Sequence, residues 1–218
     1  MIAGATLVTV IRHGEVAGRA HVYRGAQDDP MTAHGMQQVR ALTLQLATPA
    51  FDRIACSPYR RCHDFASTYA DETSTPLQVI EAFREISFGD WEGMTPEDAA
   101  QLDPTTHTLF RASAGRVAPP GGETVLQLQA RVAAGWDAWL QGSSGGHRLL
   151  VTHAGVMRAL LMHLIGLPHA HAYRIALPEA AHFQVSVLAG EAPILLNLNA
   201  TREGYAGLVK PLKRQRLR

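Results

Sequence analysis

The sequence predicts an α/β protein: a three-layer sandwich whose central sheet is mainly parallel and is covered by helices on both faces. Short β-rich runs alternate along the chain with longer runs of helical period, which is the pattern of such sheets. The first run, Leu7–Ile11, is apolar except for Thr9, as expected for a strand buried on both faces. A chain of 218 residues, 46% of them hydrophobic, is long enough to bury its own core. We therefore expect a single domain over residues 1–218.

The first third of the chain alternates predicted strands and helices. A polar loop over residues 14–30 follows the first strand, and Thr32 has the right type and position to cap the next helix. Ser57 and Pro58 have the residue types of a cap and a first turn, so they predict that a helix starts directly after the second strand. The expected elements are a helix over 33–47, a strand over 53–56, a helix over 57–69 and a strand over 77–80.

The segment from about residue 88 to 146 predicts a helical insertion, because it holds capped helices and no strand pattern. Thr95 begins one of these helices, and Thr124 with Gln127 has the pattern of a capping box for a helix through Leu140. The alternation of strands and helices then resumes. The last expected elements are a strand over 149–152, a helix over 156–165 and two closing strands over 184–188 and 194–198.

The formal charge of the chain is close to zero, with 20 Lys and Arg residues against 19 Asp and Glu residues. No global field therefore steers the chain onto nucleic acid or an anionic membrane, and a site for anions must be local. The longest apolar stretch, 154–167, is interrupted by Arg158 and His163 and is shorter than a membrane span. No signal-peptide pattern begins the chain, so we expect a cytoplasmic protein that keeps Cys56 and Cys62 reduced.

The end of the chain, over about residues 208–218, is basic, with five positive charges and no negative charge. Two interpretations stay open for this tail. It is either a solvated, frayed terminus or a flexible electropositive flap near an anion site. The sequence indicates no oligomeric state.

Reactive side chains follow three of the predicted strands. In an open parallel sheet ligands bind at the carboxyl ends of the strands, so these groups are expected to converge on one crevice. Gly14 and Gly155 would let the backbone approach a ligand closely, and helix N-termini offer free N–H groups to an anion. The pattern therefore indicates a phosphate site. The reactive groups are Arg12, His13, Arg61 and His153.

Four segments in this order resemble the histidine phosphatases, the phosphoglycerate-mutase-like superfamily. Each lies near the end of a predicted strand, and the resemblance covers about residues 5–200. The segments are "LVTVIRHGE" at 7–15, "SPYRRCHDFA" at 57–66, "REISFGDWEG" at 84–93 and "LLVTHAG" at 149–155. Within that superfamily the α-ribazole phosphatases look most similar, through "VYRGAQDDPMTAHG" at 22–35 and "FGDWEGMTPED" at 88–98. This narrower resemblance is less specific.

The resemblance implies that His13 is a nucleophile that takes the phosphoryl group onto a ring nitrogen. Arg12, Arg61 and His153 would then surround the phosphate oxygens, with His153 as a further donor if it is protonated. Physical chemistry is consistent with these roles, because an imidazole attacks only when its nitrogen is unprotonated, and nearby guanidinium groups favour that state. The same cations stabilise charge on the oxygens during transfer. Neither a metal nor an organic cofactor is implied.

The resemblance also implies that Glu85 is the acid that protonates the leaving oxygen. The same carboxylate would then activate the water that hydrolyses the phosphohistidine. Glu81, Asp90 and Glu92 lie nearby in the sequence and stay open as alternatives.

The sequence departs from the family pattern in the loop after His13. The family commonly has Thr or Ser where this chain has Val16, and an Asn that binds phosphate usually follows, but no Asn occurs between residues 15 and 32. Arg19, His21 and Arg24 are candidates to replace it, and Arg24 is the one that we expect to bind phosphate.

These observations predict a phosphomonoesterase that hydrolyses a small phosphorylated metabolite, such as α-ribazole 5′-phosphate, through a phosphohistidine. A phosphoglycerate-type mutase is an alternative, because it would share the site and return the phosphoryl group before water arrives. A module that binds a phosphorylated ligand without turnover is the alternative from a different class.

Overall fold

A single six-stranded sheet with the order β3-β2-β4-β1-β5-β6 forms the centre of the molecule in our computed structural model, which describes residues 4–199. The pairs β1–β4, β2–β4 and β2–β3 are parallel, whereas β1–β5 and β5–β6 are antiparallel. The predicted mainly parallel sheet is therefore confirmed, with an antiparallel hairpin at one edge. The strands are β1 (Thr6–Arg12), β2 (Arg53–Cys56), β3 (Leu77–Val79), β4 (His147–Thr152), β5 (His182–Val187) and β6 (Ile194–Leu198).

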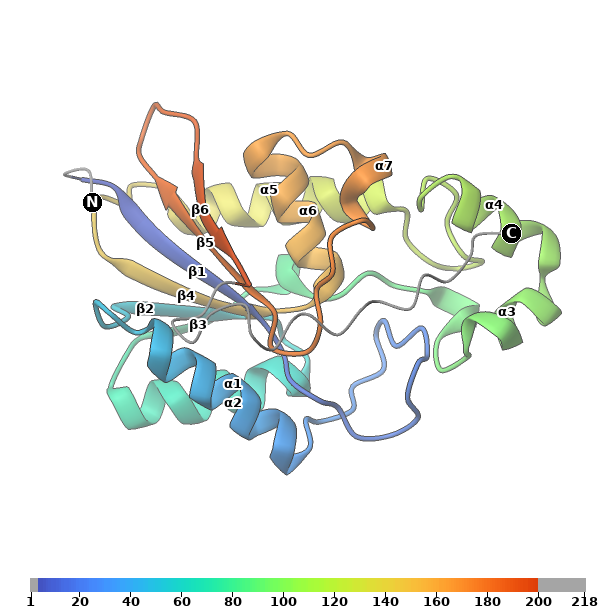
Figure 1. Cartoon of the computed structure of the whole chain (residues 1–218), viewed down its shortest axis with the longest axis horizontal. Coiled ribbons are helices and arrows are strands. Elements are labelled where there is room, and N and C mark those ends of the chain that lie inside the picture. The colour runs from blue at the N-terminus through green and yellow to red at the C-terminus, as the bar shows by residue number, and fades with distance from the viewer. Residues whose placement is uncertain (1–3, 200–218) are drawn as a thin grey trace.

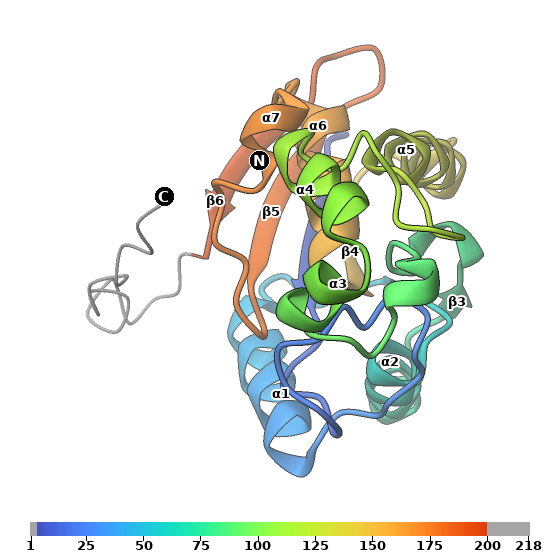
Figure 2. The ribbon, with the colours of Figure 1, turned by 90° about the vertical axis from the view of Figure 1, so that its right-hand side faces the viewer.

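Helices cover both faces of this sheet, which confirms the three-layer sandwich. Figures 1 and 2 show α1 and α2 on one face and α5 and α6 on the other. The helices are α1 (Ala33–Leu46), α2 (Arg60–Thr73), α3 (Pro96–Leu102), α4 (Pro104–Ala112), α5 (Val125–Leu140), α6 (Ala154–Ile165) and α7 (His169–Ala172). Two short 3₁₀ helices, η1 (Glu81–Phe83) and η2 (Gly89–Trp91), lie between β3 and α3.

The alternation of side chains along β1 and β4 creates a core on each face of the sheet. Val8, Val10 and Leu150 pack toward α5 and α6, whereas Leu149 and Val151 pack toward α1 and α2. All five side chains are fully buried. The two central strands are thus held from both sides, and their carboxyl ends are fixed relative to each other.

The predicted helix caps are confirmed, but the predicted start of α2 is wrong. Thr32 accepts a hydrogen bond from the Gly35 N–H, and capping boxes begin α3 and α5. However, α2 begins at Arg60, not in the turn of Ser57 and Pro58. The N-cap position is Tyr59, whereas the Ser57 hydroxyl accepts from the Tyr59 N–H at 3.3 Å and lies against the buried ring of His153.

The segment between β3 and β4 contains α3, α4 and α5. Helices α3 and α4 lie beyond the carboxyl ends of the parallel strands, near the loop that follows β1 (Figure 1). They pack around a small apolar cluster with Trp91, Ala99 and Phe110 at its centre. In contrast, α5 belongs to the helical layer and shares the core beside α6. Helices α3 and α4 therefore lie at one end of the sheet, where the reactive residues also lie.

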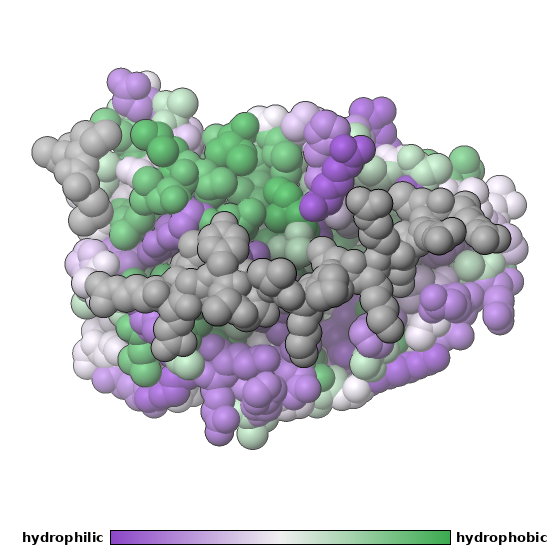
Figure 3. Space-filling model, in the orientation of Figure 1, coloured by the Kyte–Doolittle hydropathy of each residue, from purple (hydrophilic) through white to green (hydrophobic). Residues whose placement is uncertain are grey.

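Apolar surface is concentrated over β5, β6 and α6 (Figure 3). Ile194 and Leu196 of the edge strand β6 are about half exposed. No helix in residues 4–199 is both long enough and apolar enough to cross a membrane. The basic tail predicted from the sequence lies outside the described residues.

Candidate active site

A cavity of about 840 Å³ lies at the carboxyl end of β1. Its wall combines the end of β1, the loop over residues 14–25, the start of α2 and the segment that follows η1. Five of the predicted site residues come together there, as expected because the carboxyl ends of parallel strands lie at the same edge of the sheet. The titratable residues of the wall include Arg12, His13, Arg24, Arg61, Glu85 and Glu179.

His13 follows β1 directly and is almost completely buried. Its Nδ1–H donates a hydrogen bond to the carbonyl of Gly14, with Nδ1 and O 2.8 Å apart. Burial lowers the pKa of His13 well below its ordinary value, and Arg12 lowers it further, against a smaller opposite effect of the Gly14 carbonyl. The ring is therefore neutral near pH 7, and the free lone pair lies on Nε2. Such a nitrogen is able to attack phosphorus.

Arg61, in the first turn of α2, is only 1% exposed. Its Nη1 donates to the Gln27 carbonyl at 2.6 Å, its Nη2 to the Gly25 carbonyl at 2.8 Å, and its Nε to His153 Nδ1 at 3.2 Å. These bonds use three of the five N–H groups of a guanidinium. One N–H on each terminal nitrogen therefore stays available to an anion in the cavity.

His153 lies behind Arg61 and is not part of the cavity wall in the described residues. Its Nδ1 accepts from Arg61, and its Nε2 lies 2.6 Å from the hydroxyl oxygen of Ser57. Burial lowers the pKa of His153 well below its ordinary value, and Arg61 lowers it further. The arrangement thus favours a neutral His153 that orients Arg61. The sequence-based expectation is His153 at the phosphate oxygens, as a donor if protonated, whereas here its ring lies behind Arg61.

Arg12 and Arg24 also line the cavity, each tethered on one side. Arg12 Nη1 donates to the Leu177 carbonyl at 2.8 Å, while its buried Nε has no hydrogen-bond partner among the described residues. Burial lowers the pKa of Arg12, whereas Glu85 and Glu179 raise it. Arg24 forms an ion pair with Asp29 through Nη1. Both guanidinium groups thus remain close to the space that a phosphate would fill.

The three residues considered as replacements for the family's phosphate-binding Asn differ in whether they line the cavity. Arg24 and His21 are part of the cavity wall. Arg19 is not, because its side chain is 60% exposed and forms an ion pair with Asp98 at 2.9 Å. The structure therefore brings the predicted Arg24 to the cavity and leaves Arg19 at the surface.

Glu85 extends from the segment after η1 toward the start of α6. Its Oε1 accepts from the Ile86 N–H at 2.9 Å, and its Oε2 accepts from the Gly155 N–H at 3.2 Å. A Cβ at residue 155 would lie only 2.1 Å from Glu85 Oε1. Gly155 therefore makes room for this carboxylate, and the close approach of its backbone to a ligand stays a prediction.

Close packing also explains why residue 14 is a glycine. A Cβ at this position would lie 2.2 Å from the carbonyl oxygen of Gly35. Gly14 thus permits close packing of the loop on the first turn of α1, and its direct approach to a ligand stays a prediction.

The alternative acids lie outside the cavity wall. Glu92 Oε1 accepts hydrogen bonds from the backbone N–H groups of Ala26 and Phe88 at 2.9 and 3.1 Å, so it ties the loop after β1 to the segment after η1. Neither Glu81 nor Asp90 lines the cavity. Glu85 is therefore the best placed of the four carboxylates considered from the sequence.

Two features near the cavity are not predicted by the sequence: Glu179 in the wall and the contact between Ser57 and His153. Glu179 lies in the turn before β5 and contributes a third carboxylate to the wall, beside those of Glu15 and Glu85. Ser57 is fully buried against His153. Both features depend on contacts between distant parts of the chain, which no local sequence pattern indicates.

Comparison with known proteins agrees with this geometry. Residues 8–201 match the histidine phosphatase superfamily (branch 1). The chain belongs to the histidine phosphatase superfamily. The resemblance drawn from the four sequence segments is thereby confirmed.

Individual relatives of this histidine phosphatase include enzymes with different substrates. The adenosylcobalamin/alpha-ribazole phosphatase of Escherichia coli (strain K12) is 29% identical over 160 residues, which cover 73% of this chain and 79% of that protein. The crystal structure of the alpha-ribazole phosphatase from Shigella flexneri has a TM-score of 0.79 and 25% identity, covering 89% of this chain and 96% of that one. A mycobacterial glucosyl-3-phosphoglycerate phosphatase has a TM-score of 0.79 and 26% identity, with 90% and 100% covered.

Proposed function

We propose that this histidine phosphatase is a phosphomonoesterase that hydrolyses a small phosphate ester through a phosphohistidine on His13 Nε2. The observation that carries the proposal is the state of His13. It is buried beside guanidinium groups, and its Nδ1–H is bound to the Gly14 carbonyl, which leaves Nε2 unprotonated and free to attack.

In the first step, Nε2 of His13 forms a bond to phosphorus while the bond from phosphorus to the ester oxygen breaks. The leaving oxygen takes a proton from the carboxyl group of Glu85 and departs as the alcohol. Arg12, Arg24 and Arg61 stabilise the charge on the transferring phosphoryl oxygens, and the planar fork of a guanidinium suits two oxygens at once.

In the second step, the oxygen of a water molecule forms a bond to phosphorus while the bond to Nε2 breaks. Glu85 takes a proton from that water, so the carboxyl group and the neutral imidazole are restored and inorganic phosphate is released. No step uses a metal ion, because the three guanidinium groups supply the positive charge. Metal independence is part of the proposal.

The charges of the cavity support an ester whose alcohol carries no second anionic group. All three guanidinium groups of the described wall are assigned to the phosphate, whereas the carboxylates of Glu15 and Glu179 make the remaining space acidic. Val22, Phe88 and Pro178 add apolar surface. This combination favours a nucleoside-like ester such as α-ribazole 5′-phosphate over a phosphoglycerate, and it weighs against a phosphoglycerate mutase.

The proposal is tested by phosphate release from p-nitrophenyl phosphate and from a panel that includes α-ribazole 5′-phosphate and 3-phosphoglycerate, all in excess chelator. We expect hydrolysis of all three esters, with a higher kcat/KM for α-ribazole 5′-phosphate than for 3-phosphoglycerate. Transfer to a second phosphoglycerate position would indicate a mutase. Binding of phosphate esters without turnover would indicate a binding module, and activity lost in chelator and restored by Zn²⁺ or Mg²⁺ would contradict metal independence.

A further inference from the structure

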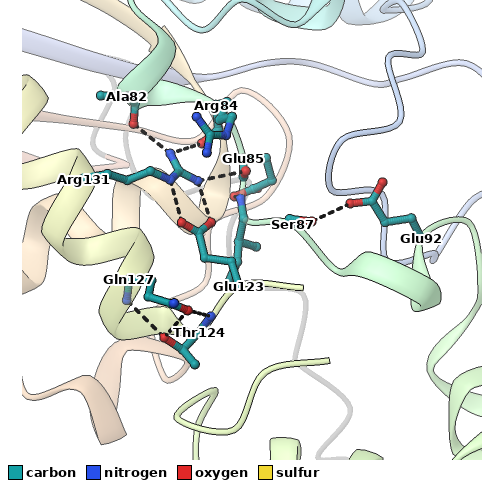
Figure 4. A network of polar contacts seen from close by, with 10 residues as sticks. Ala82, Arg84, Glu85, Ser87, Glu92, Glu123, Thr124, Gln127 and Arg131 are labelled. Atoms are coloured by element: carbon teal, nitrogen blue, oxygen red, sulfur yellow. Dashed lines mark hydrogen bonds and ion pairs between the residues drawn. The ribbon is translucent and has the colours of Figure 1, made fainter. Parts of the chain in front are cut away.

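Arg131 of α5 uses all five of its N–H groups in hydrogen bonds to protein atoms. Its Nε and Nη2 donate to the two carboxylate oxygens of Glu123, at 2.7 and 2.8 Å. Its Nη1 donates to the carbonyls of Ala82 and Arg84, each at 2.8 Å, and Nη2 donates to the Glu85 carbonyl at 3.0 Å. Figure 4 shows this guanidinium between Glu123 and the backbone around Glu85. One side chain thus fixes three carbonyls next to the carboxylate in the cavity wall.

The ion pair is shielded from water, since the side chains of Arg131 and Glu123 are only 16% and 15% exposed. A guanidinium in such surroundings needs every donor satisfied, and its planar fork fits a carboxylate in two parallel bonds. Neither residue lines the cavity. Their influence on a bound ester therefore has to pass through the segment that they hold.

That segment, residues 84–88, belongs to no helix or strand, so its backbone is held by the buried Ile86 and by bonds to side chains rather than by a regular ladder. Glu123 supports it a second time, since its N–H donates to the Ser87 carbonyl at 2.9 Å. On the opposite side, the Glu85 carboxylate is bonded to the Gly155 N–H. Glu85 is thus held at its backbone by α5 and at its carboxylate by α6.

We infer that the Glu123–Arg131 pair is a positioning device for the proton transfer of Glu85. The inference rests on the proposed acid role of Glu85. A displacement of about 1 Å can cost about 10²-fold in rate, so loosening this backbone should slow the steps that need the Glu85 proton. Binding of the phosphoryl group by Arg12 and Arg61 should be spared, because neither is bonded to the pair.

Substituting Arg131→Lys tests this inference. A lysine keeps the charge but cannot bond the carboxylate and three carbonyls together. We expect phosphoenzyme formation from an alkyl phosphate to slow by about 10- to 10²-fold, with a change under about threefold from p-nitrophenyl phosphate, whose leaving group hardly needs a proton. The matched control is Arg148→Lys, at a buried arginine that donates to the Trp139 carbonyl and lies outside the cavity wall. It should affect both substrates equally.

Glu123→Gln gives a second test if Arg131→Lys does not fold, because it weakens the ion pair and leaves the three carbonyl bonds in place. A smaller loss with the same selectivity for the alkyl substrate is expected. Equal losses on both substrates in the variants that fold would overturn the inference and leave the pair a purely structural role.

Glu85→Gln separates failure of the inference from failure of the proposed function. If Glu85→Gln shows the leaving-group selectivity but the Arg131 and Glu123 variants do not, only the positioning role fails. If Glu85→Gln itself shows no selectivity, the acid role fails and the positioning role fails with it. In the double variant Glu85→Gln/Arg131→Lys, the alkyl substrate should react no more slowly than with Glu85→Gln alone.

Discussion

Ser57 Oγ lies 2.6 Å from Nε2 of His153, and both residues are fully buried. Because Arg61 Nε donates to the opposite ring nitrogen, the proton of the neutral ring lies on Nε2 and is donated to Ser57. Ser57, His153 and Arg61 thus form one chain of hydrogen bonds that ends at the cavity. A side chain from the turn before α2 determines how the guanidinium is presented to phosphate.

Ser57→Ala should weaken both the fold and the site. The Nε2–H of His153 would lose its short bond to Ser57 and keep only the Cys62 sulfur, a weak acceptor 3.7 Å away, which costs about 1–3 kcal/mol in the free energy of unfolding. We also expect kcat/KM to fall by a similar factor for aryl and alkyl phosphates, because Arg61 binds the phosphoryl group that all substrates share. Denaturant unfolding and steady-state kinetics measure the two effects. Ser113→Ala removes a hydroxyl that donates to the Phe110 carbonyl and accepts from the Val117 N–H; as the control for activity, it should leave kcat/KM for aryl and alkyl phosphates unchanged. Unchanged stability and rate in Ser57→Ala would refute this role of Ser57.

The two buried histidines of the site predict a pH dependence of stability. Folding lowers the pKa of His13 and His153 well below the ordinary value of 6.5, so below about pH 7 the unfolded chain binds more protons than the folded one. Their contribution is fully present above pH 7 and is lost as the pH falls through 6.5 toward the folded pKa. The slope is at most about 1.4 kcal/mol per pH unit for each histidine. Denaturant unfolding at pH 5 to 8 should show a shallower slope for His13→Gln; equal slopes would show that His13 titrates normally.

Gly155→Ala should act on Glu85 alone. The added Cβ would lie 2.1 Å from Glu85 Oε1, so the carboxylate must move, whereas the backbone of the first turn of α6 accepts alanine readily. We expect a loss of about 10- to 10²-fold in phosphoenzyme formation from alkyl phosphates, with p-nitrophenyl phosphate nearly unaffected. Quenched-flow measurements on both substrates check this prediction. A loss that is the same for both would show that the methyl group disturbs phosphate binding instead.

Arg61→Ala should lower kcat by about 10² to 10³, by analogy with removal of one donor from an oxyanion site. Arg61→Lys should recover little, because an ammonium cannot reach Gly25 O, Gln27 O and the phosphate together. Arg24→Ala is the informative comparison. Since Arg24 is already paired with Asp29, its loss should raise KM more than it lowers kcat. Steady-state kinetics measure kcat and KM for each variant. A larger loss of kcat in Arg24→Ala than in Arg61→Ala would contradict these roles.

Local signals in the sequence were enough for most elements of the fold. The apolar run of β1 and the cap at Thr32 depend on neighbours in the chain, and both are confirmed. The start of α2 was wrong for a physical reason. Ser57 has the residue type of a cap, but its hydroxyl accepts a hydrogen bond from His153, which lies 96 residues away along the chain.

The site was predictable to the extent that strand ends converge in a parallel sheet. This principle brought Arg12, His13 and Arg61 together correctly. It could not show that His153 lies behind Arg61, because that depends on the order of β1, β2 and β4 in the sheet. Arg131 was missed for a similar reason, since it bonds the Glu85 carbonyl across 46 residues.

Rapid quenching without acid, after mixing with ³²P-labelled substrate, shows directly whether His13 carries the phosphoryl group. We expect about one label per active chain at saturation, stable to alkali, labile to acid, and located on His13 by peptide mapping. His13→Ala should show neither label nor turnover. Label on Ser57, or turnover by His13→Ala without any labelled intermediate, would contradict the mechanism.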